Sequence, residues 1–145
     1  IAAGGVYSKP HLITKVKDRA GGAVYRHKGV RKLAASATAT AALHGMLRAA
    51  LSRGTGQAAA IGWNSDKAAG KTGTSDDYRD AWFAGYTASL ACVVWAGRDE
   101  NTSLPGTGAE VAAPLWAKFM RAASEAGHGG GKVGSRRRGG RRAAY

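Results

Sequence analysis

Three strand-like segments follow one another in the middle of the chain and limit its possible folds more than any other feature. They cover residues 67–74, 80–87 and 90–97, and the last two are rich in the aromatic and β-branched side chains that favour strands. Short connections join antiparallel strands, whereas parallel strands need a long crossover. The sequence therefore predicts an antiparallel meander. Because side chains alternate along a strand, the middle strand would have one face with Trp82, Ala84 and Tyr86 and another with Ala81, Phe83 and Gly85.

Two amphipathic helices are predicted, one before and one after this region. The first has Ser36 or Thr38 as its cap and Gly54 as its left-handed exit. Its apolar residues recur at spacings of three and four and are predicted to be core: Ala39, Ala42, Leu43, Met46, Leu47, Ala50 and Leu51. The second covers residues 111–126, with Pro114 in its first turn and Gly127 at its end. Its apolar face comprises Ala112, Leu115, Trp116, Phe119, Met120 and Ala123.

A hairpin is predicted before the first helix. Residues 11–17 are strand-like, residues 18–22 form a turn that contains two glycines, and residues 23–26 return. Helices packed on an antiparallel sheet place the chain in the α+β class. One domain is expected for 145 residues.

The stretch AAGKTGTS at residues 68–75 has two interpretations. Gly-Lys-Thr could end a phosphate-binding loop, but such a loop needs a glycine where Ser65 stands, a buried strand before it and a helix after it. The preceding residues are broken by Gly62 and a polar group, and the following ones predict a turn and a strand. Both flanks agree better with a substrate-binding Lys-Thr-Gly-Thr strand.

Several short blocks occur in a fixed order along the chain. They are residues 69–75 (AGKTGTS), 80–87 (DAWFAGYT), 94–99 (VWAGRD), 113–116 (APLW) and 119–120 (FM), preceded by 3–7 (AGGVY), 10–16 (PHLITKV), 46–47 (ML) and 54–56 (GTG). In this order they resemble the C-terminal end of the transpeptidase domain of class A penicillin-binding proteins. The resemblance runs from about residue 1 to residue 123. It implies part of the fold shared with serine β-lactamases, with residues 1–126 as the C-terminal portion of the transpeptidase domain.

The residues of the Lys-Thr-Gly-Thr strand suit an acyl-transfer site for a peptide that ends in a carboxylate. Lys71 would attract the carboxylate, and the hydroxyls of Thr72 and Thr74 would share one face of the strand. Gly73 lets a substrate backbone approach and pair with the strand edge. The backbone N–H of Thr74 could supply half of an oxyanion hole. The resemblance implies the same roles, with the D-alanyl-D-alanine stem peptide of peptidoglycan and β-lactams as ligands.

The sequence does not contain the two other motifs of a penicillin-interacting enzyme, Ser-x-x-Lys and Ser-x-Asn. No serine is followed by lysine three residues later or by asparagine two residues later. The acylated serine, the general base and the other half of the oxyanion hole are therefore expected in a missing upstream part of the domain. The chain alone is predicted to be inactive.

The net charge of +13 is unevenly distributed. Residues 127–145 carry six basic and no acidic side chains among many glycines, and so few apolar groups predict a disordered basic tail. Such a tail could bind anionic lipid, an anionic envelope polymer or nucleic acid through phosphates. A different function therefore stays open, that of a non-catalytic basic binding module, a truncated remnant that acts through its tail.

Other patterns carry little functional signal. The four histidines have no metal-ligand spacing, and Cys92 has no partner for a disulfide and is interpreted as a small buried filler. We therefore expect no metal or cofactor. No run of about 18 apolar residues is present. The resemblance implies a bacterial envelope protein on the extracytoplasmic side of the cytoplasmic membrane, with its anchor outside this chain.

Overall fold

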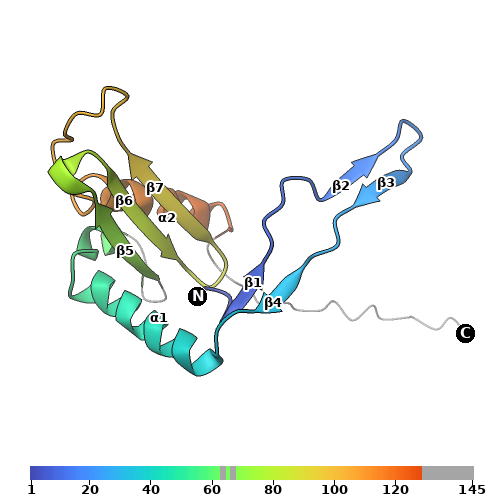
Figure 1. The fold of residues 1–145 in the computed structure, drawn as a ribbon, viewed down its shortest axis with the longest axis horizontal. Coiled ribbons are helices and arrows are strands. Elements are labelled where there is room, and N and C mark those ends of the chain that lie inside the picture. Colours follow the sequence, from blue (N-terminus) through green and yellow to red (C-terminus); the bar gives the residue numbers. More distant parts are fainter. Residues whose placement is uncertain (63–64, 66–67, 129–145) are drawn as a thin grey trace, which may run out of the picture.

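A three-stranded antiparallel sheet with two helices forms the body of the protein (Figure 1). The computed structural model describes residues 1–62, 65 and 68–128. The strands are β5 (Ala69–Thr74), β6 (Ala81–Tyr86) and β7 (Ala91–Ala96), in the order β5-β6-β7. The helices are α1 (Ala37–Ser52) and α2 (Ala112–Glu125), with two short 3-10 helices, η1 (Gln57–Ala60) and η2 (Asp76–Tyr78). The predicted meander and the α+β class are confirmed.

The core lies between α2 and one face of the sheet. Phe83 of β6 and Trp116 of α2 are fully buried and lie with ring centroids 4.9 Å apart. Trp116 also donates from Nε1 to the Cys92 carbonyl oxygen at 3.0 Å. The alternation predicted for β6 is confirmed, because Ala81, Phe83 and Gly85 are buried and the residues between them are not. Helix α2 therefore buries the centre of this face, at β6, and covers its β7 residues in part.

The apolar face predicted for α2 is partly wrong. Leu115 and Phe119 are about half exposed, at 47% and 49%. The helix instead buries a stripe of Ala112, Ala113, Trp116, Ala117 and Met120. The large indole of Trp116 fixes the rotation of the helix against the sheet, so the small alanines beside it make the contact. Its end is as predicted, because Gly127 has a φ of +85°.

Helix α1 begins as predicted, but its C-terminal end differs from the prediction. The Ser36 hydroxyl caps it by accepting from the Ala39 N–H at 3.2 Å. Gly54 is not in the left-handed region, and the chain leaves the helix through bonds from the Arg53 N–H to Ala49 and from the Gly56 N–H to Ala50.

The predicted core stripe of α1 is partly wrong, because its first four residues are exposed and only its C-terminal part, Leu47, Ala50 and Leu51, is half-buried or buried. Thr40 and Leu51 are its buried residues, and Met46 is 68% exposed. The helix lies beside β5 (Figure 1), and no other described element covers the middle of its apolar stripe. An amphipathic pattern shows which face can be buried, but a covering element must be present to bury it.

The first 33 residues contain a long two-stranded arm that projects from the body (Figure 1). At its base β1 (Val6–Ser8) pairs with β4 (Arg31–Leu33), and farther out β2 (Lys15–Lys17) pairs with β3 (Ala23–Arg26). The predicted turn is confirmed by Gly21 at a φ of +86° and by the bond from the Asp18 N–H to the Gly22 carbonyl. The predicted strand over residues 11–17 is shortened to its last three residues.

The base of the arm is held at a glycine. Gly5 has a φ of +91° and is buried, and its carbonyl oxygen accepts from the Ala34 and Ala35 N–H groups at 2.8 and 3.2 Å. A Cβ at this position would collide with the Ala35 carbonyl group. The basic tail predicted for residues 127–145 lies outside the described residues, except for Gly127 and His128.

Candidate functional site

Strand β5 forms an edge of the sheet and contains the Lys-Thr-Gly-Thr residues. The Ser75 N–H donates to the Asp80 carbonyl at 3.0 Å, one step beyond the Thr74–Ala81 pair. Bonded and non-bonded pairs alternate in an antiparallel ladder, so Thr74 and Thr72 lie in non-bonded pairs. Their backbone N–H and C=O groups therefore point away from β6, toward the free edge of the strand.

A cluster of an amine and two hydroxyls lies at this edge. Lys71 Nζ donates to the Thr72 carbonyl oxygen and to Thr72 Oγ1, both at 3.0 Å. It also reaches Thr55 Oγ1 at 3.4 Å, and the Thr55 and Thr72 hydroxyls lie 2.7 Å apart. Lys71 is exposed and has no acidic partner among the described residues. An uncompensated cation with two hydroxyl groups beside it can bind an incoming carboxylate.

Thr55 was not among the residues predicted for the site. It follows helix α1 and lies 16 residues before Lys71, so no strand periodicity connects the two. The Gly-Thr-Gly sequence at residues 54–56 is the one signal that could have identified it. The fold brings it to β5 because α1 lies beside that strand.

Thr74 has a different partner from Thr72. Its Oγ1 accepts from the Gly108 N–H at 3.0 Å. A Cβ on Gly108 would collide with the carbonyl oxygens of Gly73 and Trp82, so only a glycine lets this loop lie flat on β5 and β6. The loop before α2 thereby fixes the end of the strand at Thr74.

The same loop is closed by Thr107 and Glu110. Glu110 Oε2 accepts from the Thr107 N–H at 2.8 Å and from its hydroxyl at 3.0 Å. These bonds, the backbone bond first, lower the pKa of the Glu110 carboxyl from its ordinary value. The arrangement resembles a capping box at the start of α2 and stabilises the position of Gly108.

Asp80 anchors the entry of β6. Its Oδ1 accepts from Trp95 Nε1 at 2.8 Å, and its N–H donates to Ser75 Oγ at 2.7 Å. Trp95 and Trp82 lie side by side on the face of the sheet opposite α2, with centroids 6.1 Å apart. Gly73 lies under this pair, since a Cβ there would be 3.2 Å from Trp82 Cβ.

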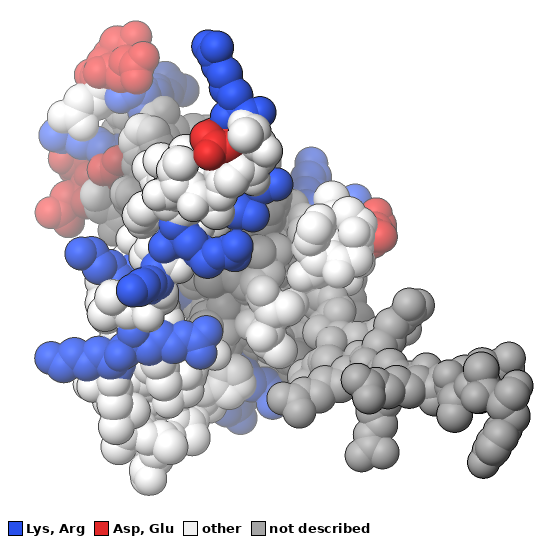
Figure 2. Space-filling model, turned by 90° about the vertical axis from the view of Figure 1, so that its right-hand side faces the viewer, with Lys and Arg blue, Asp and Glu red and all other residues white. Residues whose placement is uncertain are grey.

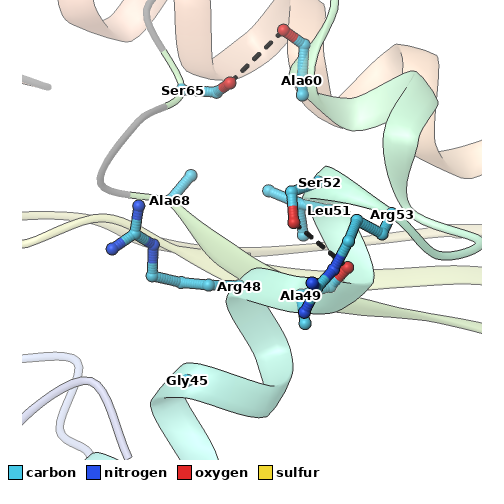
Figure 3. A pocket seen from close by; sticks show the side chains of 9 residues that line it. All are labelled: Gly45, Arg48, Ala49, Leu51, Ser52, Arg53, Ala60, Ser65 and Ala68. Carbon is cyan, nitrogen blue, oxygen red and sulfur yellow. Dashed lines mark hydrogen bonds between the residues drawn. The ribbon is translucent and has the colours of Figure 1, made fainter.

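A separate hollow of about 340 Å³ lies between α1 and the segment that leads to β5 (Figure 3). Its lining contains neither Lys71 nor the threonines of β5. Ser52 and Ser65, which point into it, donate to the carbonyls of Ala49 and Ala60. Its lining also includes Arg48 and Arg53.

Two further features are absent from the part of the chain that the structure describes. No group of three or more His, Cys, Asp or Glu side chains there could hold a metal ion. Nor is any helix among those residues both long and apolar enough to cross a bilayer.

Comparison with known proteins identifies the family. The family model of the penicillin-binding protein transpeptidase domain matches residues 1–121. Penicillin-binding protein 1A of Clostridium botulinum (strain Langeland) is 36% identical over 118 residues, which are 81% of this chain and 14% of that protein. The chain thus spans about one seventh of the length of this relative.

Solved structures agree. The crystal structure of penicillin-binding protein 1A from Haemophilus influenzae matches 84% of this chain and 24% of its own with a TM-score of 0.77, at 21% identity, which shows the shared fold. A ceftriaxone acyl-enzyme complex of penicillin-binding protein A from Mycobacterium tuberculosis matches 84% of this chain and 29% of its own with a TM-score of 0.66, at 25% identity. The chain therefore belongs to the family of penicillin-binding protein transpeptidase domains.

Proposed function

We propose that this chain is the C-terminal portion of a peptidoglycan D,D-transpeptidase domain, and that the free edge of β5 binds the carboxylate end of a D-alanyl-D-alanine stem peptide or a β-lactam. Residues 1–126 would form this portion, with residues 127–145 as a separate basic tail. The observation that carries the proposal is the cluster of Lys71 Nζ with two threonine hydroxyls at an open strand edge.

Each group at the edge has a chemical role in the proposal. The Lys71 ammonium attracts the substrate carboxylate, and the hydroxyls of Thr72 and Thr55 orient it. Gly73 presents no side chain along the edge, so an extended peptide can pair with the backbone groups of Thr72 and Thr74. The outward N–H of Thr74 then supports the oxyanion of the tetrahedral intermediate; removal of such a donor typically costs about 3 kcal/mol in other acyl-transfer enzymes.

The chain supplies one side of this site. It contains no Ser-x-x-Lys or Ser-x-Asn sequence, so the acylated serine and the general base would come from an upstream part of the same domain. The exposed stripe of α1 and the exposed tryptophans of the sheet are surfaces that this part could cover. The complete domain would act on the extracytoplasmic side of the cytoplasmic membrane of a bacterium.

Labelling with a fluorescent penicillin tests the proposal. We expect no labelling of the 145-residue chain alone, and covalent labelling when it is joined to an upstream transpeptidase segment that contains Ser-x-x-Lys. Lys71→Ala in the joined protein should remove most of the labelling, because the β-lactam carboxylate loses its counter-charge. Lys118→Ala is the matched control, since this exposed lysine lies on α2, away from β5.

Two results would contradict the proposal. Equal labelling of the Lys71→Ala and Lys118→Ala proteins would exclude Lys71 from the site. A joined protein that folds but is not labelled would favour the alternative of a non-catalytic binding module.

A further inference from the structure

The basic charge of the described protein is concentrated on the projecting arm. Residues 6–33 carry eight basic side chains and one acidic side chain, Asp18, whereas residues 34–127 carry eight of each. The arm thus has a net charge of +7 and the body has none. Figure 2 looks from the side toward which the arm projects, and Lys and Arg side chains protrude over much of that surface. Every residue of the arm except Val6 and His27 is exposed.

The pairing of the strands brings like charges together. Lys15 of β2 lies directly opposite Arg26 of β3, and like charges in such a cross-strand pair repel. No ion pair within the described residues relieves this repulsion, since the one found there joins Arg79 to Asp77 in the body. The arrangement lowers the stability of the arm unless an external anion compensates it.

Exposed apolar side chains are interleaved with these cations. Leu12 is fully exposed and Val24 is 65% exposed. The other large apolar side chains exposed on the arm are Tyr7, Ile13, Val16, Tyr25, Val30 and Leu33. Tyr25 and Val16 form one cross-strand pair, next to the pair of Lys15 and Arg26. A highly charged polymer would need only the cations, whereas the surface of an anionic bilayer interacts with both groups.

We infer that the arm of residues 6–33 binds the surface of a membrane that contains anionic phospholipids. Leu12, Ile13 and the pair of Val16 and Tyr25 would enter the boundary between headgroups and acyl chains. The long aliphatic side chains of Lys15, Lys17 and Arg26 would let their charged end groups reach the headgroup phosphates from the two-stranded arm. The base of the arm at Gly5 is held by two backbone bonds, so binding would also orient the body relative to the membrane. This inference does not depend on the site at β5.

Binding of the full chain to vesicles tests it. We expect the chain to bind vesicles of phosphatidylglycerol and phosphatidylcholine, to bind pure phosphatidylcholine much more weakly, and to lose affinity as salt is raised. Each Lys or Arg near an anionic bilayer changes affinity about fivefold, so the double variant Lys15→Gln, Lys17→Gln should bind about 25-fold more weakly. The matched control is Arg98→Gln, Lys118→Gln, which removes the same charge from exposed positions of the body and should bind like the unmodified chain.

A second double variant separates a membrane from a soluble polyanion. Leu12→Ser with Ile13→Ser, two residues placed at the headgroup boundary, should weaken vesicle binding and leave binding to soluble polyphosphate unchanged. Both side chains are exposed, so neither substitution removes core packing. The basic tail is present in every variant, so its contribution to vesicle affinity is the same in all of them and the differences in affinity report on the arm.

Three outcomes would overturn the inference. One is an equal loss in the arm and body double variants, which would indicate a general charge effect. Another is unchanged vesicle binding by the Leu12 and Ile13 variant, together with complete displacement of the chain from vesicles by polyphosphate, which would assign the arm to an anionic polymer. The third is no binding to anionic vesicles at all. None of these results bears on penicillin labelling at Lys71, which tests the proposed function separately.

Discussion

The two faces of the three-stranded sheet differ in how completely the chain covers them. On the face toward α2, Phe83 and Trp116 are fully buried, and Gly70 and Gly85 lie opposite each other to leave room for their rings. On the other face, Trp82 and Trp95 are 43% and 52% exposed. The same three strands, with alternating side chains, form both faces. The difference in side-chain burial therefore comes from helix α2, which covers one face and not the other.

The comparison separates stability from the proposed function. The covered face contains the core of the molecule, which we expect to dominate its free energy of unfolding. The open face contains Lys71, Gly73 and the tryptophan pair, beside the free edge of β5. A sheet that is closed on one side and open on the other can keep its fold while its edge stays accessible to a ligand.

The largest effect should come from the same substitution on the two faces. Trp116→Ala should lower the free energy of unfolding by about 3–5 kcal/mol, because it leaves a cavity beside Phe83 and deletes the bond to the Cys92 carbonyl. Trp82→Ala should cost about 1 kcal/mol or less, because the ring is already partly in water. Urea denaturation measures both values, and equal losses would show that the open face is as tightly packed as the covered one.

An added methyl group should distinguish the sheet core from the exposed helix. A Cβ on Gly85 would lie 2.7 Å from Trp116 Cζ2 and 2.8 Å from Phe83 Cε1, so Gly85→Ala should cost about 1–3 kcal/mol through overpacking. Gly45 in α1 has no neighbour within 4 Å of that position, and Gly45→Ala should stabilise the chain by about 1 kcal/mol through helix propensity. Thermal denaturation checks the opposite signs, and a destabilised Gly45→Ala variant would mean that α1 is covered.

The smallest effect concerns the loop that holds Thr74 and depends on pH. Folding lowers the pKa of Glu110, so the unfolded state binds the proton more tightly and the carboxylate stabilises the fold above the ordinary value of 4.5. This contribution is lost as pH falls through the lower folded pKa. The stability of the unmodified chain should therefore decrease more than that of Glu110→Gln as pH is lowered from neutral to below 4.5. Parallel stability curves for the two proteins would show that the bonds to Thr107 contribute nothing.

Some elements could be predicted because their signals are local. The three strands of the sheet, the Ser36 cap, the turn at Gly21 and the glycine end of α2 each depend on a few neighbouring residues. The Lys-Thr-Gly-Thr strand was also identified from residues within and beside it. The exposed stripe of α1 was not predicted, because periodicity identifies a face and does not show whether another segment covers it.

Other features depend on contacts between distant residues. Thr55 meets Lys71 across 16 residues, and Gly108 meets Thr74 across 34. The number of basic residues in the arm can be counted in the sequence. Only the structure shows that these residues lie on a hairpin that projects from a body with no net charge (Figure 1).

The sequence by itself determined the strands and the family blocks, and it suggested the β5 residues that we propose bind a carboxylate, because backbone preference and side-chain chemistry are properties of short segments. The tertiary structure decided which face of the sheet is closed, which threonine joins Lys71 and which charges stand apart from the body. These depend on packing and distance in space, which a linear pattern does not contain.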